Sequence, residues 1–312
     1  MFELRDQTTT SLSPDRHTRK VLVAIPAYNE DRFIGSLVWK LQARGYDVLV
    51  VDDGSTDSTA EIAEAAGATV LRHAANRGKA AAVRTAFTHA VHQNLDALIL
   101  IDGDSQHDPA EVEEVAAPVL LGKADMAVGS RFVGARSAIP RWRIAGQHAL
   151  TLATNLGSGL PLTDSQSGFR AFSRRALEVM RFRGGGFSVE SEMQFEAKSL
   201  GLAVVEVPIH VHYELPVKRN PVGQALNVLD GVLRLIAQHR PLLFFSVPGL
   251  LALLAGLALG AYVVQVYQAT LTLAIGYALI TVLLCVLGML AGFVGVVLHS
   301  MRAMFRRYGS RA

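Results

Sequence analysis

Residues 97–104 read ALILIDGD, a short apolar run that ends in two aspartates, Asp102 and Asp104. A continuous apolar run of this length is typical of a strand buried on both faces, as in a parallel sheet. The aspartates would then lie at the carboxyl edge of the sheet, where open α/β folds bind ligands. Two carboxylates one residue apart can share a hard cation such as Mg²⁺ with the phosphates of a substrate. A simpler alternative stays open, because Asp and Gly also commonly end strands and begin loops.

Residues 21–130 alternate between strand-like and helix-like patterns. Strands are expected at 21–25, 47–51, 68–71 and 95–101 and from residue 126 onward, and helices at 31–44, 56–66, 79–92 and 109–121. Beyond them the sequence predicts helices at 140–160 and 190–200, a loop and strand at 164–173 and a strand at 204–207. Because alternating βα units build parallel sheets, we expect a three-layer α/β domain with a mostly parallel sheet.

The C-terminal part of the chain has the composition of a membrane segment. Residues 241–300 contain no Asp, Glu, Lys or Arg, and apolar stretches at 242–267 and 271–298 are separated by an expected turn at 268–270. Each stretch exceeds the roughly 20 apolar residues that cross a bilayer, which favours a transmembrane hairpin over a helical hairpin buried in a soluble core. Arg302, Arg306 and Arg307 follow directly. By the positive-inside rule they predict an integral membrane protein whose α/β domain and termini are cytoplasmic.

The basic residues lie next to the hydrophobic part of the chain. The net charge of the 312 residues is +3, and the basic residues flank the hydrophobic stretches, which favours contact with lipid headgroups over binding of nucleic acid. Residues 222–238 are amphipathic and are expected to lie in the membrane interface, although a core helix would show the same pattern.

The expected parts are a flexible tail at 1–19, an α/β domain at 20–220, an amphipathic helix at 221–240, the hairpin at 241–300 and a basic tail at 301–312.

Three more polar clusters lie at expected strand ends or at the start of a helix. They read PAYNE at 26–30, DDGSTD at 52–57 and NRGK at 76–79. In this topology they converge with Asp102 and Asp104 on one face. Acids at Asp52 or Asp53 suit donors on a base or ribose, and the helix that starts at Lys79 offers a positive end to phosphates. Together they predict a nucleoside diphosphate site. The glycine fingerprints of dinucleotide-binding and P-loop proteins are absent, which disfavours a nicotinamide dehydrogenase or a P-loop ATPase.

These four motifs resemble, in their order, the signatures of family-2 glycosyltransferases with a GT-A fold. The stretch DSQSGFR at 164–170 and the C-terminal hairpin narrow the resemblance to the polyprenyl- and dolichyl-phosphate mannose or glucose synthases, and it covers about residues 20–300. The resemblance implies a metal-dependent, inverting transfer of one sugar from a nucleotide sugar, of the GDP-mannose or UDP-glucose type, to a polyprenyl or dolichyl phosphate. Residues 20–220 would form the GT-A catalytic domain.

The resemblance also implies roles for individual residues. Asp102, Asp104 and Arg131 would be catalytic. The nucleotide would be bound by Pro26, Tyr28, Glu30, Asp52, Asp53, Lys79 and Gly103. Mg²⁺ or Mn²⁺ would be held by Asp102, Asp104 and Gln106. The acceptor phosphate or the diphosphate would contact Arg131, Arg170, Lys218 and Arg219. The sequence LPVKR at 215–219 departs from the Gly-x-Ser-Lys that the family often shows there. The signature of processive synthases, Gln-x-x-Arg-Trp, is absent, because Ala138 stands where the signature has Gln before Arg141-Trp142. This difference favours transfer of a single sugar.

Other interpretations of the same features stay open. The first rival is a transferase of the same fold that acts on another membrane glycolipid or a polysaccharide, and the second is a non-catalytic membrane scaffold. His107 either shapes its loop or ligates the metal, and residues 184–186, Gly-Gly-Gly, are expected to form a flexible loop over the site. The basic residues Arg131, Arg136, Arg141 and Arg143 would also suit a solvated face. Small residues in the hairpin permit close helix packing within one chain or in a homo-oligomer, at Gly256, Gly260, Gly288, Gly292 and Gly295.

Overall fold

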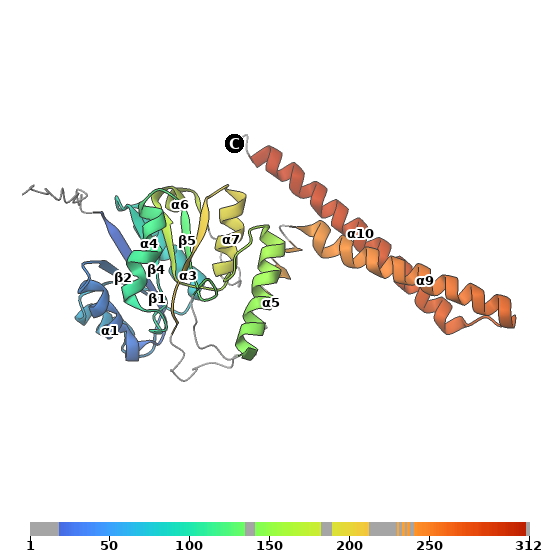
Figure 1. The fold of residues 1–312 in the computed structure, drawn as a ribbon, viewed down its shortest axis with the longest axis horizontal. Helices are drawn as coiled ribbons and strands as arrows, with labels where there is room; N and C mark the ends of the chain where they lie inside the picture. The colour runs from blue at the N-terminus through green and yellow to red at the C-terminus, as the bar shows by residue number, and fades with distance from the viewer. Residues whose placement is uncertain are drawn as a thin grey trace, which may run out of the picture. The chain divides into compact units, whose positions relative to one another are not determined.

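The computed structural model describes residues 19–134, 141–181, 189–211, 230, 233–234, 236–237 and 240–309 (Figure 1). The chain forms two compact units. The first consists of Met1–Ala127, Phe169–Val179 and Ala203–Val205, and the second of Val128–Gly168, Met180–Leu202 and Glu206–Ala312. Much of the expected amphipathic helix at 222–238 lies outside the described residues, as do the N-terminal tail up to residue 18 and the glycines at 184–186.

A seven-stranded sheet confirms the expected α/β class. Its strands follow the order β3-β2-β1-β4-β6-β5-β7. They are β1 (Val21–Ala27), β2 (Asp47–Asp52), β3 (Thr69–Arg72), β4 (Ala97–Leu100), β5 (Met126–Ser130), β6 (Arg170–Ser173) and β7 (Val204–Pro208). β1 pairs in parallel with β2 and β4, and β2 with β3. β6 pairs antiparallel with β4. β4 is buried along its whole length and β2 is buried after its first residue, Asp47, which explains the apolar sequences of these central strands.

Helices α1 to α4 follow the strands of the first unit. They are α1 (Asp31–Gln42), α2 (Thr59–Ala65), α3 (Lys79–Val91) and, after a 3₁₀ turn at Pro109–Glu111, α4 (Val112–Leu120). α1 buries Ile34, Leu37, Val38 and Leu41, at the spacing of one helical face. α2 begins three residues later than the sequence predicts. The N–H of Thr56 donates to the side chain of Asn29 (2.9 Å), so this residue joins two loops instead of opening the helix.

Three further helices lie in the described residues of the α/β part. They are α5 (Arg141–Ser158), α6 (Arg174–Val179) and α7 (Val189–Ser199). α6 belongs to the first unit, whereas α5 and α7 pack together in the second. The expected helices at 140–160 and 190–200 are therefore present, with ends shifted by one or two residues.

The C-terminal hairpin consists of a π-helical turn at Leu242–Ser246, α9 (Val247–Thr270) and α10 (Ile275–Gly309) (Figure 1). Leu242–Thr270 and Ile275–Met301 are long and apolar enough to cross a membrane, with mean hydropathies of 2.4 and 2.7. The expected turn at 268–270 is wrong, because α9 continues through Thr270 and Leu271 ends it in a left-handed conformation with φ 55°. A Cβ atom on Gly249 would lie 2.7 Å from the carbonyl oxygen of Gly288, so glycines bring the two helices into close contact within the chain.

Candidate active site

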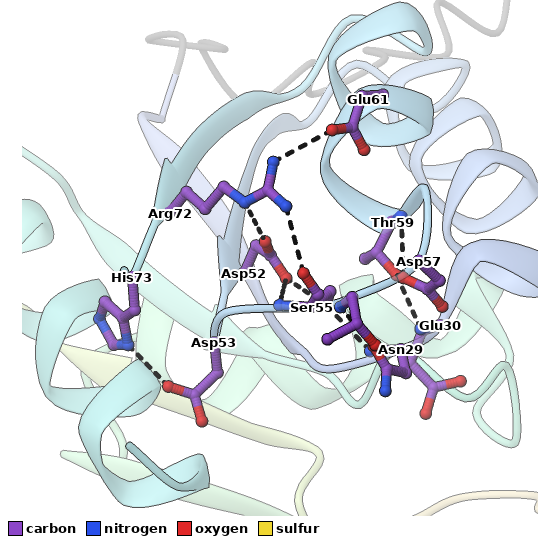
Figure 2. Close-up of polar contacts among 11 residues, drawn as sticks. Asn29, Glu30, Asp52, Asp53, Ser55, Asp57, Thr59, Glu61, Arg72 and His73 are labelled. Carbon is purple, nitrogen blue, oxygen red and sulfur yellow. Dashed lines mark hydrogen bonds and ion pairs between the residues drawn. The ribbon is translucent and has the colours of Figure 1, made fainter. Parts of the chain in front are cut away.

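The loops that follow β1 and β2 are joined by hydrogen bonds (Figure 2). Asn29 has a positive φ of 56°, its N–H donates to the hydroxyl of Ser55 (2.9 Å), and its side-chain oxygen accepts from the N–H of Thr56 (2.9 Å). The N–H of Glu30 donates to the hydroxyl of Thr59 (2.8 Å). The motif at 26–30 and the motif at 52–57 therefore form one polar platform at the carboxyl ends of two neighbouring parallel strands, as the topology predicts.

The two aspartates at the end of β2 have different partners. Asp52 is fully buried, its Oδ2 lies 3.1 Å from Nε of Arg72, and its Oδ1 accepts from the N–H of Ser55 (3.1 Å). Asp53 accepts from the backbone N–H groups of Arg77 (3.0 Å) and Gly78 (2.7 Å). Asp52 therefore connects the end of β2 to Arg72 and to the loop residue Ser55. Asp53 instead holds in place the loop that leads into α3.

His73 completes the environment of Asp53 and was not anticipated from the sequence. Its Nδ1 lies 2.7 Å from Oδ1 of Asp53 (Figure 2). Its Nε2 lies 2.9 Å from the hydroxyl of Thr85. A carboxylate offers about four lone-pair positions, so Asp53 keeps capacity for one further donor beyond these three. Arg72 ends β3 and His73 directly follows it, and their place at a third strand end is the signal that could have pointed to them.

Gly54 allows the loop after β2 to touch the loop before α3. Its φ is 71°, and a Cβ atom there would lie 2.5 Å from the carbonyl carbon of Ala75. We expect Gly54→Ala to lower the free energy of unfolding by at least about 2 kcal/mol. The cost of a left-handed backbone at a residue with a side chain adds to the cost of the clash between its Cβ atom and the backbone of Ala75. Thermal unfolding of the full chain in detergent measures the loss.

Gly122→Ala is the matched control for that substitution, because Gly122 has φ 70° but no atom within 4 Å of the added Cβ. It should cost only about 1 kcal/mol. Equal losses in the two variants would contradict the close approach of the two loops.

The two aspartates after β4 lie in an acidic cluster with one lysine. Nζ of Lys79 is 2.6 Å from Oδ1 of Asp102, and the N–H of Gln106 donates to Oδ1 of Asp104 (3.1 Å). The pKa of Asp104 is raised to about 6, first by burial of the carboxyl group and then by the negative charges of Asp102 and Glu30, against the lowering effects of the Gln106 N–H and of Lys79. Three carboxylates therefore share one region that Lys79 alone does not neutralise.

These residues fit a divalent cation that a substrate helps to hold. Among the described residues, no group of three or more His, Cys, Asp or Glu side chains is arranged to hold a metal ion by itself. Mg²⁺ characteristically binds one or two carboxylates together with substrate phosphates and water, which matches the pair Asp102 and Asp104, in which the pKa of Asp104 is raised. Gly103 lies between the aspartates, and a Cβ atom there would be 3.5 Å from Cγ of Glu30.

His107 and Phe169 pack against each other in the first unit. Their ring centroids are 5.3 Å apart, and both side chains are buried. This packing supports the interpretation in which His107 shapes its loop.

Arg131 and Asp164 form a bidentate ion pair in the second unit. Nε and Nη2 of Arg131 lie 2.6 and 2.7 Å from the two carboxylate oxygens of Asp164, whose side chain is fully buried. The backbone N–H groups of Thr163 and Asp164 donate to Glu206 (2.8 and 3.0 Å). The guanidinium of Arg131 therefore holds the start of the DSQSGFR stretch in place.

The remaining candidates for an acceptor phosphate have different positions. Arg170 is the largest fully buried side chain among the residues that the structure describes, so its surroundings would have to move before it touched a ligand. Lys218, Arg219 and Arg136 lie outside the described residues.

Comparison with known proteins matches residues 22–181 to the family model described as glycosyl transferase family 2. A UDP-N-acetylglucosamine–dolichyl-phosphate N-acetylglucosaminyltransferase of Methanococcus voltae is 32% identical over 68% of this chain and 91% of the relative. An undecaprenyl-phosphate mannosyltransferase of Micrococcus luteus is 31% identical over 61% of this chain and 82% of the relative. The crystal structure of glucosyl-3-phosphoglycerate synthase from Mycobacterium tuberculosis with Mn²⁺, UDP-glucose and phosphoglyceric acid aligns with a TM-score of 0.56 at 24% identity, covering 71% of this chain and 81% of that one.

The family match runs from β1 through α6 and so contains every strand end that carries an acidic motif. The resemblance seen in the sequence is thereby confirmed, together with the GT-A-like sheet. This chain belongs to glycosyl transferase family 2.

Proposed function

We propose that this glycosyltransferase moves one sugar from a nucleotide sugar to a polyprenyl or dolichyl phosphate, with inversion at the anomeric carbon and with a divalent cation. The observation that carries the proposal is the acidic cluster after β4, in which Nζ of Lys79 lies 2.6 Å from Asp102 and the pKa of Asp104 is raised, together with two helices apolar enough to cross a bilayer. Two relatives are named for transfer to a dolichyl or undecaprenyl phosphate, and a structural neighbour is crystallised with Mn²⁺ and UDP-glucose.

The acidic cluster is the proposed metal and diphosphate site. Asp102, Asp104 and Gln106 would hold Mg²⁺ or Mn²⁺, and Lys79, which contacts Asp102, would bind a phosphate of the donor. When bound, the cation neutralises the charge that grows on the departing nucleoside diphosphate.

The joined loops after β1 and β2 are the proposed nucleoside site. Pro26 lies near the end of β1, and Tyr28 and Glu30 lie on the loop that follows it. Asp53 would accept a hydrogen bond from the base or ribose at its remaining lone-pair position. Asp52, being buried and paired with Arg72, contributes by holding this loop in position.

The acceptor supplies its own nucleophile. A lipid phosphate is an anion at neutral pH, so it needs little or no general base, unlike a sugar hydroxyl. One phosphate oxygen attacks the anomeric carbon of the sugar, the bond from that carbon to the nucleoside diphosphate breaks, and the electron pair leaves with the diphosphate. Basic side chains orient the acceptor phosphate, a role proposed for Arg219 through bidentate hydrogen bonds and for Lys218 as a point charge. Arg170 is proposed for the same role once its surroundings move, because its side chain is fully buried. Arg131 is proposed to act through Asp164, which it holds in place.

We further propose that residues 20–220 form the catalytic domain, that 221–240 lie at the interface and that 241–300 form the hairpin. Arg302, Arg306 and Arg307 directly follow the second apolar span, Ile275–Met301, and by the positive-inside rule they support a cytoplasmic side for the catalytic domain and both termini.

A panel of nucleotide sugars, tested with and without a polyprenyl phosphate in lipid vesicles, tests the donor and the metal together. We expect one donor to release its nucleoside diphosphate many-fold faster when the polyprenyl phosphate is present, and chelation of divalent cations to abolish the release. If release of the nucleoside diphosphate did not depend on the polyprenyl phosphate but rose with a membrane glycolipid, the result would support a transferase that acts on another acceptor. The absence of nucleotide binding in calorimetry would support the scaffold.

A further inference from the structure

The carboxylate of Asp53 has little capacity left to accept hydrogen bonds from a ligand. Its Oδ1 lies 2.7 Å from Nδ1 of His73 and accepts from the backbone N–H of Arg77 (3.0 Å), whereas its Oδ2 accepts from the N–H of Gly78 (2.7 Å). Each carboxylate oxygen offers about two lone-pair positions. Oδ1 is therefore filled if His73 donates to it, and Oδ2 can accept from one more donor.

The ring of His73 supplies the hydrogen in its contact with Asp53. Backbone N–H groups donate to both oxygens of this carboxylate, so Asp53 acts as an acceptor, and an ionised carboxylate has no hydrogen to donate. Nδ1 of His73 therefore carries a hydrogen. In the neutral ring Nε2 is then an acceptor, and the hydroxyl of Thr85 on α3, 2.9 Å away, can donate to it. Thr85 thus favours the tautomer in which His73 occupies Oδ1.

The carboxylate of Asp53 is held in this orientation. The N–H of Asp53 donates to the carbonyl oxygen of Ala27 (2.9 Å), and the N–H of His73 donates to that of Asp52 (2.9 Å), so both backbones are tied to neighbouring strands. The side chains of His73 and Asp53 are only 8% and 4% exposed. Turning the carboxylate would leave the buried Nδ1–H of His73 without its partner, which is costly. Figure 2 shows one oxygen of Asp53 turned toward His73 and the other turned away from it.

The common nucleobases differ in the donors on the edge that would face Asp53. Guanine presents two adjacent donors, its ring N1–H and its amino group, which pair with a carboxylate through both of its oxygens. Uracil presents a single donor, N3–H. Cytosine and adenine present an unprotonated ring nitrogen beside an amino group, and the lone pair of that nitrogen repels a carboxylate. The one open position on Oδ2 therefore matches the single N3–H of uracil.

We infer that Asp53 and His73 select a uridine nucleotide as the sugar donor. Oδ2 of Asp53 accepts from N3–H of uracil, and His73 is a positioning residue that closes Oδ1 to the second donor of guanine. Guanine in this site would keep one donor without a partner, and a site built around hydrogen bonds rejects a base in that way. The inference rests on the proposed nucleoside site and deepens the proposed function by naming the base.

Calorimetry of the full chain in detergent micelles with Mn²⁺ tests the selection, with UDP, GDP and CDP as the ligands. We expect UDP to bind at least about 10-fold more tightly than either GDP or CDP, the scale of one unpaired hydrogen-bonding group. Binding of GDP or CDP as tight as that of UDP would overturn the inference, since Asp53 would then not contact N3–H, and would leave the proposed function intact. If none of the three nucleotides bound, the proposed function would fail together with the inference.

Two substitutions of His73 separate its hydrogen bond from its bulk. Asn and Leu are close in size, but only Asn can place an N–H where Nδ1 of His73 lies. We expect His73→Leu to lower the ratio of UDP affinity to GDP affinity by at least about 5-fold, because Oδ1 of Asp53 becomes free to accept from guanine. His73→Asn should keep most of the ratio. His92→Leu, at an exposed histidine that directly follows α3, is the control and should leave the ratio unchanged.

The role of His73 would be overturned if His73→Leu kept the ratio of the parent chain, or if His73→Asn lost the ratio as fully as His73→Leu. The comparison of UDP with GDP and CDP on the parent chain does not require either variant to fold, so it tests the selection of uridine by itself.

Discussion

Asp104→Asn is expected to lower sugar transfer by at least about 100-fold, the usual scale for losing a group that stabilises charge at the reacting centre. The substitution keeps the size of the side chain and the backbone hydrogen bond pattern but removes a negatively charged oxygen from the proposed metal site. Transfer to polyprenyl phosphate, measured across a range of Mn²⁺ concentrations, gives the loss and shows whether more metal restores activity.

The same variant should make the metal-free protein more stable. Because the pKa of Asp104 in the folded protein is about 6, against an ordinary value of 3.8, keeping its carboxylate ionised at pH 7 costs up to about 3 kcal/mol. Asp104→Asn removes this cost, so its thermal unfolding midpoint should exceed that of the parent chain in the presence of a chelator. A variant that loses activity while gaining stability is the signature of a residue kept for function.

The gain in stability from Asp104→Asn should decrease as the pH falls from 7 to 5. Between pH 3.8 and about 6 the folded protein binds more protons at Asp104 than the unfolded chain, so this group favours folding more as the pH falls. The stability difference between Asp104→Asn and the parent is therefore largest at pH 7 and shrinks at pH 5. Asp47→Asn, which changes an exposed aspartate at the start of β2, is the matched control and should alter neither activity nor stability. If the stability difference between Asp104→Asn and the parent did not change with pH, the pKa of Asp104 would not be raised by burial in the folded protein.

Arg131→Ala is expected to lower the free energy of unfolding by about 3–5 kcal/mol, because it leaves the fully buried Asp164 carboxylate without its cation. Combining Arg131→Met with Asp164→Asn should recover part of this loss, since the second change removes the unpaired charge. Thermal unfolding of the single and double variants measures the coupling between the two residues.

The exposed pair Arg174–Glu178 supplies the control for that experiment. Its side chains are 53% and 54% exposed, and Arg174→Ala should cost no more than about 1 kcal/mol. If Arg131→Ala left stability unchanged and abolished transfer, Arg131 would act on the acceptor directly and not through Asp164.

Features that depend on neighbouring residues were predictable from the sequence. The buried runs of β1, β2 and β4, the apolar face of α1 and the length of the two C-terminal apolar helices follow from periodicity and composition alone. The convergence of the polar motifs followed from a general property of parallel sheets, whose strand ends meet at one edge.

Features that depend on distant partners were not predictable in the same way. The start of α2 is set by Asn29, which lies 27 residues before Thr56, and the position of the hairpin turn is set by where Leu271 takes a left-handed conformation. β6 runs antiparallel to β4, a pairing between segments about 70 residues apart that no local pattern encodes. The role of Asp53 in fixing the loop before α3, and the pairing of Arg131 with Asp164, likewise emerge only when the chain is folded.

The central claim is that the acceptor is a lipid phosphate, and the mass of the product tests it most directly. The full chain in lipid vesicles is given Mn²⁺, a nucleotide sugar and equal amounts of a polyprenyl phosphate and the corresponding polyprenol, and the lipids are then analysed by mass spectrometry. The account predicts one new species, the polyprenyl phosphate plus a single hexose or N-acetylhexosamine, and an unchanged polyprenol. A glycosylated polyprenol, more than one sugar on the polyprenyl phosphate, or free sugar without any glycolipid would contradict it.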